Sequence, residues 1–172
     1  MSKESNSASP ITAEEPALDE MGILITLRVV AVAMAGGLVG MVLMLPLLAG
    51  VPLALDLFQT ESIVEFSSFG LYIGLEPSLT TGIVLFLLGG TTVLPLLFLV
   101  AGAFLPPEEP RYLRGATYAT IFWIGFLFAF WPGGSVLTEA LFVVISLVSH
   151  WIYGTTLGYV LHSAIGVPQH NV

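Results

Sequence analysis

One short stretch carries the side chains that could do chemistry inside an otherwise apolar segment. Within residues 136–163 the polar side chains stand three or four positions apart, so they would share one face of a helix: Ser146, Ser149, His150 and Tyr153. His150 is the only strongly polar side chain near the middle of this segment. An ionisable side chain within a membrane is costly and marks a functional site by default. His150 could move protons, ligate a haem iron or hydrogen-bond to a neighbouring helix.

The interpretation that we favour for His150 is structural. A neutral imidazole would hydrogen-bond to a neighbouring helix, with Ser149 and Tyr153 as local partners. Haem ligation would need a second axial ligand from another helix, and His162 and His170 lie on or beyond the same helix. Methionine could replace it in principle, but methionine in an apolar helix is usually a packing residue: Met34, Met41 and Met44. We therefore predict no cofactor and do not expect haem to be bound.

The chain shows no residue pattern for catalysis. The nearest acid in the same segment, Glu139, stands 11 residues before His150, which is roughly 16 Å along a helix. Cysteine is absent, as are HExxH and a glycine-rich phosphate loop. We predict no catalytic residues and no metal site, and we do not expect an enzyme.

Long apolar runs predict how the chain is organised. Hydrophobic residues make up 56% of the sequence, mean hydropathy is +0.95, and runs of about 18 residues or more can span a bilayer. We predict an all-α integral membrane four-helix bundle over residues 22–167. An acidic, disordered tail (1–21) would precede it, and a short tail (168–172) would follow. The helices are expected at about 23–48, 79–104, 112–131 and 136–163.

Several local features refine this prediction. Pro46 is expected to end or kink the first helix, and Ser135 to cap the fourth. Residues 62–75 are too short and too polar to span, so they form either an interfacial amphipathic helix, which we favour, or a re-entrant loop. The phenylalanines of the third helix are spread around it, so several must meet lipid. Small residues recur at spacings that allow close helix packing: Gly36, Gly40, Gly82, Gly89, Gly115, Gly154 and Gly158.

Charge predicts the orientation and excludes one class of partner. The net charge of −8 makes nucleic acid a poor partner, because phosphate binding needs clustered Lys and Arg. The basic residues Lys3, Arg28, Arg111 and Arg114 all fall on one side of a four-span topology. By the positive-inside rule, both termini of this multi-pass cell-membrane protein would be cytoplasmic. The acidic connection would face outward: Asp56, Glu61, Glu65 and Glu76.

Three parts of the sequence resemble a known family: the motif Ser149-His150-Trp-Ile-Tyr153-Gly154-Thr-Thr-Leu-Gly158, the glycine-rich first helix, and Arg114-Gly-Ala-Thr-Tyr118. Its members are small four-helix integral membrane proteins of unknown function from haloarchaea, which close with a similar His-x-x-Tyr-Gly-x-x-x-Gly helix. Many members carry another histidine in the second helix, and this sequence has none there. Some members are associated with respiratory oxidase genes, so the resemblance implies a link to a terminal oxidase.

These observations favour one function and leave two alternatives. We predict a non-catalytic accessory or assembly subunit of a larger membrane complex, such as a respiratory terminal oxidase. Its partners would be membrane lipid and either oxidase subunits or further copies of itself. The alternatives are a small membrane transporter or channel, and a haem- or quinone-binding protein that uses His150. Ion-coupled transport usually needs several buried ionisable groups, which disfavours the first of these.

Overall fold

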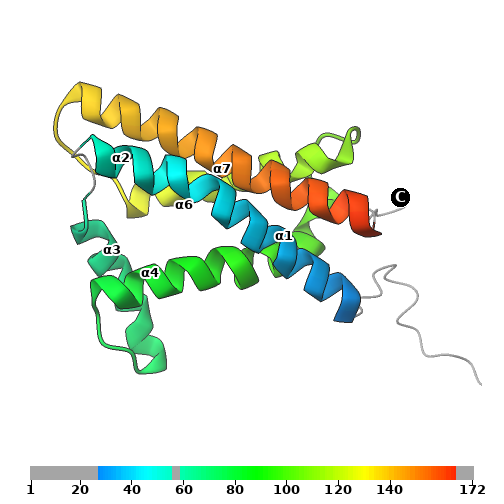
Figure 1. The fold of residues 1–172 in the computed structure, drawn as a ribbon, viewed down its shortest axis with the longest axis horizontal. Coiled ribbons are helices and arrows are strands. Elements are labelled where there is room, and N and C mark those ends of the chain that lie inside the picture. The colour runs from blue at the N-terminus through cyan, green and yellow to red at the C-terminus, as the bar shows by residue number, and fades with distance from the viewer. Residues whose placement is uncertain (1–26, 56–58, 166–172) are drawn as a thin grey trace, which may run out of the picture.

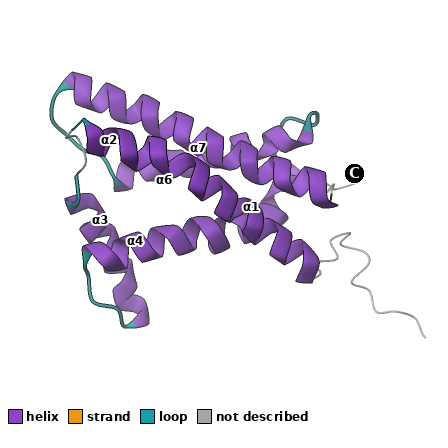
Figure 2. Ribbon diagram, in the orientation of Figure 1, coloured by secondary structure: helices purple, strands orange, loops and turns teal. Residues whose placement is uncertain are grey.

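A computed structural model describes residues 27–55 and 59–165. Every regular element in these residues is helical (Figure 2). The predicted tails, 1–21 and 168–172, lie outside the described residues. The α-helices are α1 (Leu27–Leu45), α2 (Val51–Ala54), α3 (Glu61–Phe66), α4 (Leu79–Leu88), α5 (Leu94–Ala101), α6 (Arg114–Ala129) and α7 (Val136–Ile165). The π-helical turns are η2 (Pro46–Gly50) and η4 (Gly89–Val93), and the 3-10 turns are η3 (Ser67–Ile73), η5 (Gly102–Phe104) and η6 (Arg111–Leu113).

Three helices of the described chain are long and apolar enough to cross a membrane: Leu27–Ala54, Leu79–Phe104 and Val136–Ile165. They confirm the prediction of an all-α membrane protein. In the region of the third predicted span, 112–131, η6 runs directly into α6, so the helical stretch extends from Arg111 to Ala129. It is not among the three candidate spans. α6 alone has 16 residues, roughly 24 Å at 1.5 Å per residue, and the hydrocarbon core of a bilayer is about 30 Å thick.

Two of the spans pass a proline with a π-helical turn. The first span does not end near residue 48. It turns through η2, which begins at Pro46, and continues to Ala54. In the second span, η4 stands just before Pro95. Proline has no N–H and its ring crowds the preceding turn, and π turns within α-helices are frequent at functional sites.

α7 is the central helix of the bundle (Figure 1). It packs along α1 on one side and along α6 on the other. The second span contacts this group mainly through η4 and α5, which lie against α1. Its first half, α4, packs on α3 and η3, and Figure 1 shows α4 and α7 diverging toward the end where α3 lies. The helices are therefore closely packed at one end and splayed at the other.

The buried core is small, and much of the apolar surface faces outward. The core cluster consists of Ala33, Met41, Met44, Phe98, Leu99, Tyr118, Tyr153, Leu157 and Leu161. Large apolar side chains such as Leu38, Leu88 and Val100 are more than half exposed. Phe128 of α6 is 85% exposed, in agreement with the prediction that aromatic residues of this helix face outward. This distribution suits a protein surrounded by lipid hydrocarbon.

Residues 61–73 are helical. α3 and η3 run across the start of α4 rather than along it (Figure 1). The buried hydroxyl of Ser67 joins the two, because it donates to the carbonyl of Val64 and accepts from the backbone N–H of Ser78 at 2.9 Å. The structure thus shows that this segment is helical; its place at the membrane interface stays a prediction.

Serine hydroxyls cap two of the spans. Ser135 caps α7 as predicted, since it accepts from the backbone N–H of Thr138 at 3.2 Å. Ser78 caps α4 in the same way and accepts from the N–H of Thr81 at 3.0 Å. Each cap satisfies a backbone donor that the first turn of the helix leaves free.

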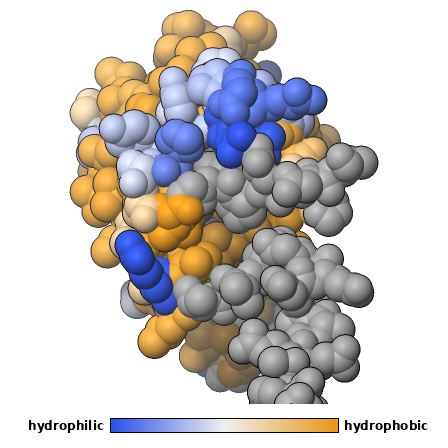
Figure 3. All heavy atoms as spheres, turned by 90° about the vertical axis from the view of Figure 1, so that its right-hand side faces the viewer, coloured by the Kyte–Doolittle hydropathy of each residue, from blue (hydrophilic) through white to orange (hydrophobic). Residues whose placement is uncertain are grey.

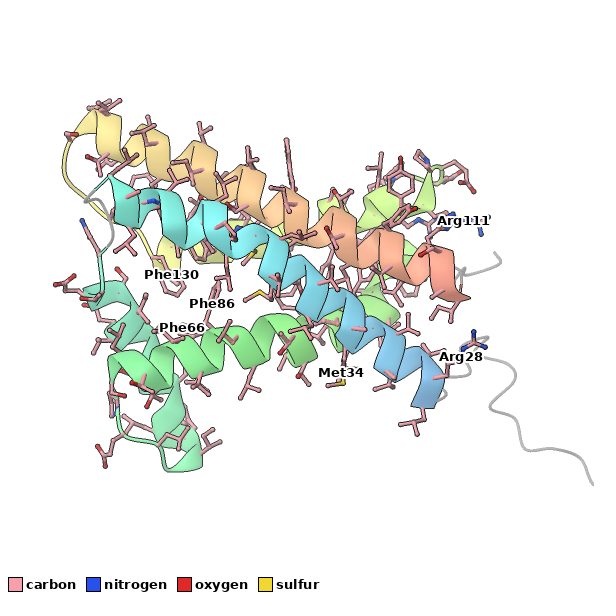
Figure 4. The ribbon with its side chains drawn as sticks, in the orientation of Figure 1. Arg28, Met34, Phe66, Phe86, Arg111 and Phe130 are labelled. Atoms are coloured by element: carbon pink, nitrogen blue, oxygen red, sulfur yellow. The ribbon has the colours of Figure 1, made fainter. Side chains whose placement is uncertain are left out.

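The described basic side chains gather at one end of the molecule. Arg28 and Arg111 lie at the end where α1 begins and α7 ends (Figure 4), and Arg114 follows Arg111 at the start of α6. Figure 3 views this end and shows hydrophilic residues together, surrounded by hydrophobic ones. The acidic segment that contains Glu61 lies at the opposite end (Figure 1). This separation is the pattern on which the predicted orientation depends.

We expect an impermeant thiol reagent to label Ser68→Cys but not Ser5→Cys in intact cells. Ser68 is exposed on η3, at the end opposite the arginines, and Ser5 belongs to the N-terminal segment, which the positive-inside rule places in the cytoplasm. The chain has no cysteine, so each variant reports on one site. Labelling of both variants after membrane permeabilisation is the control. Labelling of Ser5→Cys in intact cells would reverse the orientation.

Candidate functional site

The polar side chains that the sequence singled out are all buried in the structure. Ser146, Ser149, His150 and Tyr153 lie on the face of α7 that packs on the other helices, and none is more than 7% exposed. Burial against protein rather than lipid is what polar groups at membrane depth require. α7 therefore presents this face to the interior over two turns.

Three of these side chains hydrogen-bond first to their own helix. The hydroxyl of Ser149 donates to the carbonyl of Ile145 at 2.7 Å. The Ser146 hydroxyl donates to the carbonyl of Val143 at 3.3 Å and accepts from Trp123 Nε1 of α6 at 2.9 Å. His150 Nδ1 lies 2.7 Å from the Ser146 carbonyl oxygen. Because a carbonyl only accepts, Nδ1 carries the hydrogen, and the neutral ring has its lone pair on Nε2.

We predicted that His150 would hydrogen-bond to a neighbouring helix. In the structure, Tyr153 makes the hydrogen bond from this face to the second span. The Tyr153 hydroxyl donates to the carbonyl of Gly90 at 2.6 Å. In the π turn, the N–H of Leu94 bonds to Gly89, and the next residue that could bond to Gly90 is Pro95, which has no N–H. Tyr153 supplies the missing donor. The imidazole is shorter and reaches a carbonyl of its own helix instead.

Most of the glycines that the sequence assigned to helix packing have close neighbours within the chain. A Cβ at Gly154 or Gly115 would meet the backbone of the other residue, and a Cβ at Gly158 would meet the backbone of Tyr112. On α1, Gly36 faces Leu157 and Val160, and Gly40 faces Tyr153. Gly82 approaches the backbone of Ile63. Gly89 differs, because the space beside it is open. These small-residue faces are thus largely used inside the chain.

A cavity of about 290 Å³ lies between the second span and the other helices, beside this polar face. His150 and Tyr153 form part of its wall, and the rest is apolar or aromatic: Met41, Met44, Phe66, Leu85, Phe86, Gly89, Gly90, Leu94, Phe122, Gly125, Phe126, Ala129 and Phe130. A second apolar cavity of about 300 Å³ shares Phe86, Phe126 and Phe130 with it. The splayed arrangement of α4 leaves this space.

Aromatic rings bridge the opening between α3, α4 and α6. The ring centroids of Phe66 and Phe130 are 5.3 Å apart, and those of Phe86 and Phe130 are 6.0 Å apart. Figure 4 shows these three side chains directed toward one another across the gap. Phe126 lies deeper, and its ring centroid is 4.8 Å from that of His150. A continuous aromatic lining therefore leads to the imidazole.

Sequence reasoning missed the role of Arg114, which is only 7% exposed. Its guanidinium donates to backbone carbonyls alone: Nε to Pro107 at 2.9 Å, Nη1 to Ala103 at 3.4 Å and Nη2 to Glu108 at 3.5 Å. It thus binds the C-terminal end of the second span and the loop that follows. A cation is stabilised at a helix C-terminus by the unpaired carbonyls there.

His150 Nε2 is the candidate nitrogen ligand for a haem iron at this site, and the thioether side chains of Met41 and Met44 line the same cavity. Among residues 27–55 and 59–165, no three His, Cys, Asp or Glu side chains gather closely enough to hold a metal ion. What the site offers chemically is a hydrogen-bond acceptor in apolar surroundings.

Comparison with known proteins gives one match. Residues 27–172 match a family described as "Family of unknown function (DUF6789)". No curated protein and no solved structure matches the sequence.

Proposed function

The chain belongs to the DUF6789 family, whose function is unknown, and we propose that it is a non-catalytic accessory or assembly subunit of a larger membrane complex. The observation that carries the proposal is the surface of η3 at the splayed end of the bundle. Consecutive large apolar side chains stand there more than half exposed: Leu71, Tyr72 and Ile73, with Phe69 beside them. They lie on the segment that crosses the start of α4, outside the three spans (Figure 1).

The charge around this surface favours a protein partner over a lipid surface. Glu61, Glu65 and Glu76 flank it and are exposed, and residues 59–77 contain no Lys or Arg. Helices that lie on anionic membranes are typically rich in Lys and Arg on their polar face. Acidic side chains around an apolar patch instead suit a protein that offers apolar residues with a basic rim.

The partner that we propose is a respiratory terminal oxidase. This choice rests on the resemblance to small haloarchaeal membrane proteins, some of which are associated with oxidase genes. The glycine faces do not add support, because most of them are used within the chain. In a dimer formed through this surface, two acidic surfaces would face each other, and like-charge repulsion disfavours that arrangement.

Deleting the gene is expected to lower both the amount of assembled oxidase and oxygen uptake at least twofold. Wild type should restore both, and Tyr72→Ser/Ile73→Ser should not. The matched control is Val136→Ser/Leu137→Ser. Tyr72 and Ile73 are 88% and 69% exposed, and Val136 and Leu137 are 83% and 69% exposed. Both pairs lie at the splayed end (Figure 1). Unchanged oxidase in the deletion strain, with no membrane subunit co-purifying with the tagged protein, would contradict the proposal.

A further inference from the structure

The imidazole of His150 leaves one polar atom unused inside the protein. Nδ1 is bonded to the Ser146 carbonyl, and none of the hydrogen bonds among the described residues involves Nε2. The described residues contain no fully enclosed side-chain nitrogen or oxygen without a partner, so Nε2 must be open to a neighbouring space. His150 is 7% exposed and forms part of the wall of the 290 Å³ cavity. Because the cavity is the space that His150 is known to border, we infer that the open nitrogen faces it.

The other polar groups around the cavity are already paired. Tyr153 is the other polar side chain of the cavity wall, and its hydroxyl donates to the carbonyl of Gly90. A neutral imidazole with hydrogen on Nδ1 presents only an acceptor at Nε2. A ligand that brings one hydroxyl hydrogen to this atom therefore gains an interaction that hydrocarbon cannot provide.

The lining indicates the rest of the ligand. Phe122 and Phe126 come from α6 and Phe130 directly follows it. Phe66 and Phe86 come from α3 and α4, and the sulfurs of Met41 and Met44 belong to α1. Aromatic rings pack well on one another in offset or edge-to-face geometry, and methionine sulfur makes favourable contacts with rings. Ligand pockets have volumes of about 300 Å³ and above, so this cavity is a small one. It has room for one ring and a short part of an attached chain.

We infer that the cavity is a binding site for a membrane-soluble phenol or hydroquinone, whose ring lies among the phenylalanines and whose hydroxyl donates to His150 Nε2. The apolar tail would extend through the neighbouring 300 Å³ cavity, which shares Phe86, Phe126 and Phe130 with the first. This site does not depend on the proposed partner surface, which lies on η3. No chemical step is assigned to the ligand.

Binding of para-hexylphenol and of its methyl ether, para-hexylanisole, tests the hydroxyl. Calorimetric titration of the purified protein in detergent, corrected for partition into empty micelles, should show one saturable site. The phenol should bind at least tenfold more tightly than the ether, equivalent to about 1.4 kcal/mol. In His150→Leu the two affinities should come within twofold of each other. His162→Leu, which removes an exposed histidine of the same helix, should behave as wild type.

Gly125→Leu tests the place of binding without touching His150. Gly125 belongs to the cavity wall and has no atom within 4 Å of an added Cβ, so we expect a leucine there to be tolerated and to fill part of the cavity. It should weaken both probes at least fivefold. Equal binding of phenol and ether to wild type, an undiminished preference in a folded His150→Leu, or unchanged binding to Gly125→Leu would each overturn the inference. Dodecanol binding as tightly as the phenol would overturn its aromatic part.

Discussion

Gly154→Val is expected to lower the free energy of unfolding by more than about 4 kcal/mol, a loss that accompanies only severe packing conflicts. A Cβ at Gly154 would meet the backbone carbonyl of Gly115 and the Cβ of Ala119. Backbone atoms cannot move aside as a flexible side chain can, so α6 and α7 would have to separate. Circular dichroism during thermal unfolding in detergent should show a much lower midpoint or no cooperative transition.

Gly125→Val is the matched control for this prediction. It makes the same substitution in α6, at a position where an added Cβ meets no atom within 4 Å. The intrinsic effect of valine in a helix is therefore present in both variants, and only Gly154→Val adds the clash. Similar midpoints for the two variants would show that α6 and α7 are not packed through the Gly115–Gly154 contact.

The main features of the fold could be predicted from the sequence because they depend on hydrophobic length. The run from Leu79 to Phe104 has no charged residue and is apolar apart from its threonines, and the structure has a continuous span over the same residues. The end of the first span could not be predicted, because Pro46 permits either termination or a π turn. The choice of the π turn depends on helix packing, which local sequence does not encode.

The candidate site was predictable as a face but not as a set of contacts. Spacing alone placed Ser146, Ser149, His150 and Tyr153 on one side of α7. The partner of Tyr153 could not be foreseen, because the free carbonyl of Gly90 exists only where a π turn precedes Pro95. The sequence does carry a signal for it, a proline five residues after a glycine within an apolar helix. The cavity was not predicted at all, since it results from the divergence of whole helices.

Arg114 has a structural role in addition to the topological role that the positive-inside rule assigns to its charge. The rule counts its charge and ignores its contacts. In the structure it reaches the carbonyls of Ala103, Pro107 and Glu108, and so joins the end of the second span to the start of α6. Arg111, three residues earlier, pairs instead with exposed Glu109 at 2.9 Å. Two arginines with the same topological charge therefore have different structural roles.

Arg114→Met is expected to lower the free energy of unfolding by about 2–3 kcal/mol, because it leaves partly buried carbonyls without donors. Arg111→Met should cost less than Arg114→Met, because its ion pair with Glu109 is partly open to solvent and such pairs contribute about 1 kcal/mol or less. Both variants lose one positive charge from the same loop, so any effect of charge on orientation is matched. Equilibrium unfolding in mixed micelles measures the difference.

The stability of Arg114→Lys should fall between those of wild type and Arg114→Met, because an ammonium group keeps the charge but cannot bind three carbonyls at once as a planar guanidinium does. Equal losses for Arg114→Met and Arg111→Met would mean that charge, and not these hydrogen bonds, is what the loop requires.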